Sequence, residues 1–229
     1  MTRKIGLSWS SGKDSAWALH VLRQTSTDRV TGLFSVVNER FDRVSMHATR
    51  VELLRLQAEA VGLPLQTIHL PDPCPNHRYD AIMGGFVADC AAQGTNSFAF
   101  GDLYLEDVRQ YREKQLAGTG VEPIFPLWRL PTRELAEWML AAGLEAYISC
   151  VDLKKLPASF AGRRWSRELL EKLPPEVDPC GENGEFHTIV VDGPMFAERI
   201  EVELGEVKQR DGFAYADIIP LNRGERRIP

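Results

Sequence analysis

A short strand, a loop of small residues and a helix open this 229-residue chain, and they constrain its fold more than any other feature. The apolar stretch Ile5-Gly6-Leu7 runs into the loop SWSSGKDS at 8–15 and then into the helical pattern AWALHVLRQ. The backbone N–H groups of a first helical turn have no partner inside the helix, and the helix dipole adds positive potential there. The loop is therefore predicted to bind an anion, with phosphate as the natural occupant.

The residue types in this loop fit that prediction. Small residues let the backbone approach a ligand closely, hydroxyl groups donate hydrogen bonds, and a lysine adds a full positive charge. The residues expected to contact the phosphates are Ser10, Ser11, Gly12, Lys13, Asp14 and Ser15.

The loop is not the nucleotide-binding P-loop, G-x-x-x-x-G-K-[ST]. Gly6 lies one residue too far from Gly12, and Lys13 is followed by Asp14 where that motif needs a hydroxyl residue to hold magnesium. An acidic residue at this place implies a different chemistry.

Strand and helix patterns alternate after the loop. Strands are expected at 30–37, 65–70, 97–100, 122–125 and 146–151, and helices at 48–61, 79–92 and 131–142. Thr132 is the expected N-cap of the last of these helices. The order predicts an α/β fold with a doubly wound parallel sheet, which binds ligands at the carboxyl ends of its strands. Ser10, Asn38 and Gly101 fall at such ends.

The alternation stops beyond residue 125. Residues 153–179 have the pattern of a loop with one short helix at 166–173, and Arg210-Asp211-Gly212-Phe213 predicts a hairpin turn between strands at 200–208 and 214–219. We therefore expect one domain at 1–125 and a smaller C-terminal α+β region with a terminal hairpin at 126–229.

A second cluster of polar residues lies at 180–188, with the sequence CGENGEFHT. Glycines that flank acidic residues imply a tight turn that directs side chains into one small volume. By itself the segment is equally typical of a surface turn with solvated acids. The residues that could act on a ligand are Glu182, Asn183, Glu185, His187 and Thr188.

Both segments resemble motifs of known enzymes. The loop at 10–15 is similar to the S-G-G-x-D-S loop of the PP-loop ATP pyrophosphatase superfamily, with Ser11 at the place of the first glycine. Residues 180–188, followed by V-x-D-G-P at 190–194, resemble the C-G-E-x-G-E-[FY]-x-T signature of the diphthine–ammonia ligase family, a branch of that superfamily. Further matches in the same order are Met46-His47, L-x-x-x-Q-A-x-x-x-G-[IL]-P at 53–64, Gly101-Asp102 and Pro126-Leu127-Trp128.

The resemblance implies an ATP-dependent, AMP-forming carboxylate–ammonia ligase. ATP would place its pyrophosphate in the loop with Mg²⁺, an acceptor carboxylate would attack the α-phosphorus, and ammonia would then displace AMP. By the same resemblance, Lys13, Asp14, Glu182, Glu185 and His187 are catalytic, and His187 could take a proton from ammonium. The resemblance also implies the following contacts: Val36, Gly101 and Asp102 for ATP, Asp14 and Asp102 for Mg²⁺, and Met46, His47, Tyr104, Glu182, Asn183, Glu185, His187 and Thr188 for the acceptor. Lys13→Ala is expected to remove AMP formation and leave the fold intact.

Two departures from the family pattern leave the acceptor open. Residues 103–113 differ from the family's Y-Q-R-x-R-V-E run, and His187 stands where many members have glutamate. A cobalamin-like small molecule is therefore a candidate acceptor beside a modified protein side chain. Two different functions also fit the sequence: a tRNA-thiolating enzyme, with Cys150 and Cys180 meeting in space, and a non-catalytic adenine-nucleotide sensor.

Composition narrows the set of partners. With 27 basic and 32 acidic residues the net charge is −5, which argues against a protein that binds nucleic acid by bulk electrostatics. The sequence has no apolar run of bilayer length and no signal-peptide pattern, so a cytoplasmic location is expected. The four cysteines form no C-x-x-C pair, and neither a disulfide framework nor a zinc knuckle is predicted. A homodimer is one option for the oligomeric state.

Overall fold

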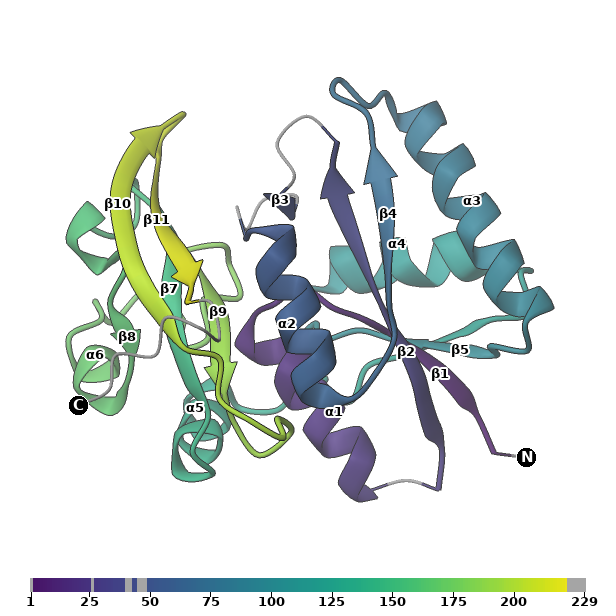
Figure 1. Ribbon diagram of the computed structural model, residues 1–229, viewed down its shortest axis with the longest axis horizontal. Helices are drawn as coiled ribbons and strands as arrows, with labels where there is room; N and C mark the ends of the chain where they lie inside the picture. Colours follow the sequence, from purple (N-terminus) through teal and green to yellow (C-terminus); the bar gives the residue numbers. More distant parts are fainter. Residues whose placement is uncertain (1, 26, 40–42, 45–48, 222–229) are drawn as a thin grey trace.

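The computed structural model describes residues 2–25, 27–39, 43–44 and 49–221, which form two β-sheets with helices packed against them (Figure 1). The first sheet contains β1 (Lys4–Ser8), β2 (Arg29–Asn38), β3 (Arg43–Val44), β4 (Leu65–Leu70), β5 (Ser97–Ala99) and β6 (Glu122–Ile124). Its helices are α1 (Lys13–Thr25), α2 (Val51–Val61), α3 (Asn76–Ala92) and α4 (Glu106–Leu116).

Five strands of the first sheet are parallel, in the order β4-β2-β1-β5-β6, and β3 pairs antiparallel with the end of β2. The chain fills the sheet outward from β1 in one direction and then returns to fill the other side from β5. Ligands of such sheets bind where the strand order reverses, outside the carboxyl ends of the two central strands. The predicted α/β doubly wound fold is confirmed, and its reversal point lies between β1 and β5.

The two faces of this sheet pack on different helices. Phe34 of β2 and Phe98 of β5 meet Phe86 of α3, with ring centroids 4.6 to 5.6 Å apart. On the other face the buried residues of α1 and α2 join a larger core that continues into the C-terminal region. Strands covered on both faces explain the nearly continuous apolar runs in the sequence.

The second sheet is antiparallel. It contains β7 (Glu145–Asp152), β8 (Arg164–Trp165), β9 (Phe186–Asp192), β10 (Val202–Arg210) and β11 (Phe213–Pro220). The remaining elements are α5 (Thr132–Ala141), a 3₁₀ turn at Ala158–Phe160 and α6 (Arg167–Glu171). The predicted hairpin turn is confirmed, because Asp211 and Gly212 both adopt positive φ, as a two-residue hairpin loop requires.

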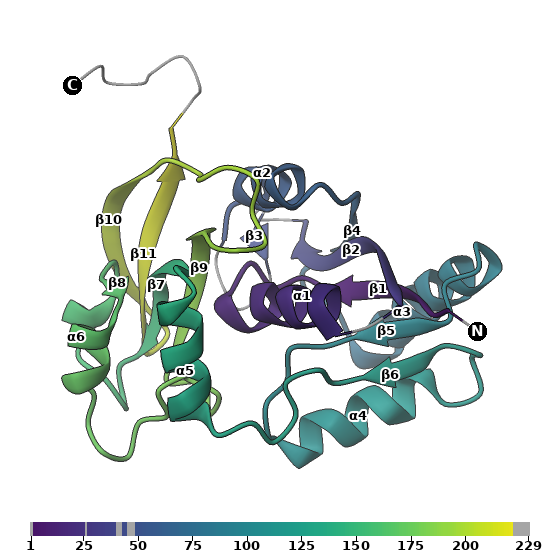
Figure 2. The same cartoon turned by 90° about the horizontal axis from the view of Figure 1, so that it is seen from below.

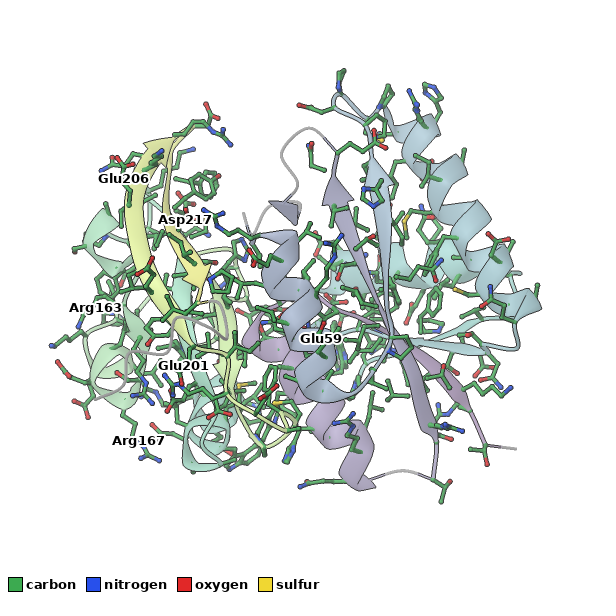
Figure 3. All side chains as sticks on the ribbon, in the orientation of Figure 1. Glu59, Arg163, Arg167, Glu201, Glu206 and Asp217 are labelled. Atoms are coloured by element: carbon green, nitrogen blue, oxygen red, sulfur yellow. The ribbon has the colours of Figure 1, made fainter. Side chains whose placement is uncertain are left out.

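Helices α1 and α2 lie between the two sheets (Figure 2), where α1 contacts β9 and α2 contacts β11. Arg50, the residue before α2, donates from Nε to Asp217 of β11 at 3.0 Å, and the Asp217 side chain is labelled in Figure 3. The buried amide of Gln57 on α2 donates to the carbonyls of Ser11 and Val190 at 3.0 and 2.7 Å. Hydrogen bonds as well as apolar packing therefore join the two sheets.

Several elements differ from what the sequence predicted. α4 was not predicted, because its sequence EDVRQYREKQL is largely polar and buries only Leu116. α2 begins at Val51 after an extended Arg50, later than expected. The N-cap of α5 is Pro131, and the Thr132 hydroxyl instead donates to Asp178 at 2.6 Å.

Two further expectations concern membrane-spanning segments and the acceptor residues Met46 and His47. Within the described ranges, no helix combines the length and the apolar character needed to cross a membrane. Met46 and His47, expected at the acceptor, lie outside the described residues.

A candidate active site between the two sheets

A cavity of about 320 Å³ opens at the reversal point of the parallel sheet. We call it the phosphate cavity; its walls come from the loop after β1, the segment after β5, α4, and the turn leading into β9. It brings together ten residues that the sequence predicted for one site, namely Ser10, Gly12, Lys13, Asp14, Ser15, Gly101, Asp102, Glu182, His187 and Thr188. Segments about 170 residues apart in the chain therefore face the same space.

The loop backbone is held by its own hydroxyls. The Ser15 hydroxyl donates to the Gly12 carbonyl at 2.9 Å and accepts from the hydroxyl of Ser10 at 3.1 Å. Ser11 has a φ of +70°, the left-handed conformation that glycine adopts without strain, which accounts for the glycine in the related motif. The Ser11 hydroxyl is buried against Thr49 at 2.8 Å and does not line the cavity.

The Lys13 ammonium is buried, with 2% of the residue exposed. It donates to both carboxylate oxygens of Asp14, at 3.0 and 2.8 Å, and to the Cys180 carbonyl. The rings of Trp165 and Phe186 flank it, with centroids 5.7 and 5.8 Å away. Burial works against its charge, but Asp14 prevails and the pKa of Lys13 is raised, so the ammonium stays charged.

Because of these contacts, a substitution of Lys13 is expected to affect the stability of the fold as well as catalysis. Removal of the ammonium leaves Asp14 and the Cys180 carbonyl without their buried donor. The cost is about 2–3 kcal/mol, less than for a fully buried pair, because the Asp14 side chain is 26% exposed. The expectation that Lys13→Ala leaves the fold intact conflicts with this arrangement.

Gly101 lets the segment after β5 lie directly against the first turn of α1. A Cβ atom at Gly101 would come within 2.9 Å of the backbone carbon of Asp14 and the backbone nitrogen of Ser15. The G-D pair therefore has a steric role beside the phosphate loop, and the neighbouring Asp102 carboxylate faces the cavity.

A network of hydrogen bonds shapes the turn that carries Glu182. Asp178 accepts from the backbone N–H groups of Cys180 and Glu182, at 2.8 and 3.3 Å. Glu185 is 2% exposed and accepts from the Asp178 backbone N–H and the Asn183 amide, at 3.1 and 3.0 Å. Neither the exposed Asn183 nor the buried Glu185 lines the cavity.

Glu182 carries a strongly perturbed carboxyl group in the cavity wall. Its Oε1 accepts from the backbone N–H groups of Leu103 and Tyr104, at 2.7 and 3.3 Å. Burial, with Asp14 nearby, raises its pKa to about 7 in spite of these bonds. A carboxyl group with this pKa can hold or release a proton near neutral pH, which suits an acid–base role.

His187 and Tyr104 are uncharged in the fold. Burial and the charge of Lys13 lower the pKa of His187 to about 4, so the imidazole is neutral at pH 7. Burial and the charge of Asp178 raise the pKa of Tyr104 to about 12. An imidazole with so low a pKa is a poor acceptor for a proton from ammonium, and Glu182 suits that task better.

Asp14 and Asp102 have the donor chemistry for Mg²⁺, which takes one or two carboxylates and fills its other positions with phosphate and water oxygens. Asp102 Oδ2 is buried and has no hydrogen-bond partner within the described residues. Burial raises the pKa of Asp102 although Arg112 opposes this, and the nearby charge of Asp14 adds to the rise. A cation would give Asp102 Oδ2 a partner, and Asp14, already bound to Lys13, presents a second carboxylate to the same cavity, so the donor chemistry of these residues fits the metal.

A second cavity, of about 340 Å³, adjoins the first and contains Val36. We call it the apolar cavity, because it is lined mainly by hydrophobic side chains from β2, β5, α3 and α4. The two cavities share Ser8, Ser10, Phe100 and Arg112. The sequence analysis assigned no role to Arg112, Gln57 or Asp178, whose partners are distant in the chain. The signal for Gln57 was its match to the Q of the family stretch at 53–64, and that for Arg112 was its place in the divergent 103–113 run.

The cysteines of the alternative thiolation hypothesis, Cys150 and Cys180, are both buried. All four cysteines of the chain are free thiols. Cys180 donates to the Thr132 carbonyl at 3.4 Å, and burial raises its pKa strongly, while burial raises the pKa of Cys150 to about 12. Protonated, buried thiols are weak nucleophiles.

Comparisons with known proteins identify the family of this chain. The family model of the diphthamide synthase N-terminal domain matches residues 3–121, and that of the diphthamide synthase C-terminal domain matches residues 131–221. A diphthine–ammonia ligase of Danio rerio is 27% identical over 240 residues, covering 94% of this chain and 92% of the relative. That of Bos taurus is 26% identical over 183 residues, covering 72% and 68%. The chain belongs to the diphthamide synthase family.

Proposed function

We propose that this protein is an ATP-dependent ligase that converts an acceptor carboxylate into an amide, with diphthine as the acceptor and ammonia as the nitrogen donor. The relatives are named diphthine–ammonia ligase. The observation that carries the proposal is the single cavity in which the phosphate loop meets Glu182, His187 and Thr188 of the C-terminal signature.

The two cavities suit the two ends of ATP. In this proposal the adenine lies in the apolar cavity beside Val36, and the β- and γ-phosphates lie against Ser10–Ser15. Residues 1–125 then supply the nucleotide side and residues 126–229 the acceptor side. Both cavities lie at the strand ends where doubly wound sheets bind nucleotides.

The first step joins the acceptor to AMP. A carboxylate oxygen attacks the α-phosphorus, the bond from that phosphorus to the β-phosphate oxygen breaks, and pyrophosphate leaves with the electron pair. A carboxylate is already a competent nucleophile, so positioning and charge stabilisation supply the catalysis. Asp14 and Asp102 would hold Mg²⁺, which neutralises phosphate charge when bound. Lys13 keeps Asp14 in place and ties the loop to the Cys180 carbonyl.

The second step forms the amide. The ammonia nitrogen attacks the acyl carbon, the bond from that carbon to the AMP oxygen breaks, and AMP leaves with the electron pair. The nitrogen must lose a proton, and the Glu182 carboxylate is the group whose pKa, about 7, suits that transfer. Thr188 and the neutral His187 line the wall where the acceptor enters.

AMP release measured with separate additions tests the proposal. We expect AMP only when ATP, ammonium and a diphthine-bearing protein are all present, and a loss of AMP in Glu182→Gln with ATP binding retained. AMP release with a cobalamin-like carboxylate, and none with the diphthine-bearing protein, would show that the acceptor is a small molecule and not diphthine. ATP binding with no AMP from any acceptor would make the protein a nucleotide sensor and contradict the proposal.

A further inference from the structure

Arg112 of α4 stands at the junction of the two cavities. Among the described residues, the cavities share four lining residues, Ser8, Ser10, Phe100 and Arg112. If ATP lies as proposed, with its base in the apolar cavity and its terminal phosphates in the loop, the ribose and the α-phosphate must pass this shared wall. The α-phosphorus is the reacting atom, so a role for Arg112 at this wall rests on the proposed function.

The charges in the phosphate cavity favour Arg112 as the ligand of that phosphate. The cationic side chains among the described lining residues are Lys13 and Arg112. Lys13 is already bound to Asp14 and to the Cys180 carbonyl. The ion pair of Arg112 with Asp102 is 3.7 Å long, which exceeds a hydrogen bond, and the buried Nε of Arg112 has no hydrogen bond within the described part of the chain.

The guanidinium is nevertheless well positioned. It lies over the Phe100 ring, with 4.8 Å from its carbon to the ring centroid, and Phe100 belongs to the same shared wall. Such stacking holds the guanidinium plane without using its N–H donors. A planar guanidinium whose Nε has no hydrogen-bond partner among the described residues suits two phosphate oxygens at once.

We infer that Arg112 binds the α-phosphate of ATP and is a catalytic residue of the adenylation step. Negative charge grows on the α-phosphoryl oxygens as the acceptor oxygen attacks and before pyrophosphate departs. A fixed guanidinium in a partly buried site stabilises that charge more than it stabilises the ground state.

Calorimetric binding of AMP and of pyrophosphate, each added alone, tests this assignment. AMP carries the α-phosphate and pyrophosphate carries only the leaving group. We expect Arg112→Met to weaken AMP binding about 10- to 100-fold, as the loss of a charged hydrogen bond implies, and to change pyrophosphate binding less than about twofold. Arg109→Met is the matched control, because Arg109 lies on the same helix over Phe125 and Trp128 and lines neither cavity.

Three results would overturn the inference: no AMP binding by the wild type, unchanged AMP affinity in Arg112→Met, or equal losses for AMP and pyrophosphate, which would put Arg112 on the terminal phosphates. Thermal unfolding shows whether the variant folds, and Arg112→Lys, which keeps the charge, supports the same comparison if it does not. Wild-type protein that binds ATP and AMP but never releases AMP would contradict the proposed function and leave the Arg112 comparison valid.

Discussion

Burial in the folded protein favours the neutral form of the Glu182 carboxyl group. Its pKa therefore rises from 4.5 in the unfolded chain to about 7 in the fold. The folded state therefore binds the proton more tightly, and the contribution of Glu182 to stability is lost as pH rises from about 4.5 through 7. At about 1.4 kcal/mol per pKa unit, reduced for the partial exposure of Glu182, this amounts to about 1–2 kcal/mol.

Glu182→Gln is neutral at every pH and keeps an oxygen for the N–H groups of Leu103 and Tyr104. We expect the variant to be about 1–2 kcal/mol more stable than the wild type at pH 8 and nearly equal at pH 5, measured by urea unfolding. His187 affects both proteins alike and cancels in this comparison. Glu203→Gln, at an exposed position on β10, is the control. An equal gain at both pH values would contradict the burial of the Glu182 charge.

Lys13 and Asp14 form a pair whose members depend on each other. We expect Lys13→Met to lower the free energy of unfolding by about 2–3 kcal/mol, less than for a fully buried pair, because the Asp14 carboxylate, 26% exposed, loses its buried partner. The double variant Lys13→Met/Asp14→Asn should recover part of that loss, since the uncompensated charge is gone. A double variant no more stable than Lys13→Met would show that the Cys180 carbonyl, and not Asp14, sets the cost.

Among the elements, the segment after β5 lies in close backbone contact with the first turn of α1. We expect Gly101→Ala to destabilise the protein by about 1–3 kcal/mol and to abolish ATP binding, because its Cβ would meet the backbone of Asp14 and Ser15. Gly85→Ala is the matched control: in α3 its Cβ meets no atom within 4 Å, and it should stabilise by about 0.5–1 kcal/mol. Urea unfolding and nucleotide calorimetry on both variants check this.

Sequence periodicity predicted the elements whose apolar residues repeat at one spacing, such as β4 and α5, and it failed for α4. α4 is covered by charged residues, and tertiary contacts such as Arg112 over Phe100 fix its place. The phosphate loop was predictable because its residues are consecutive. The Thr132 to Asp178 bond spans 46 residues, so no local pattern could show that Thr132 serves the site instead of capping α5.

The whole molecule should unfold as one unit, because Gln57, Lys13 and the core shared between the sheets tie its two halves together. ATP at about 100 times its Kd adds about 2.7 kcal/mol, which corresponds to a rise of about 5–10 °C in Tm for a chain of this size. We expect calorimetry to show a single transition that moves as a whole. Two transitions, with only one shifted by ATP, would show that the halves are independent.

The two edges of strand β9 have different neighbours. One side pairs with β7, and on the other side the Val190 N–H donates to the Ser11 carbonyl at 3.0 Å while the Val190 carbonyl accepts from Gln57. The loop at 8–15 thus covers the edge of β9 that does not pair with β7. An uncovered sheet edge is a template for pairing between molecules. Occupancy of the loop by ATP should therefore slow aggregation during heating, so this protein's solubility would depend on the cell's energy supply as well as on its own sequence.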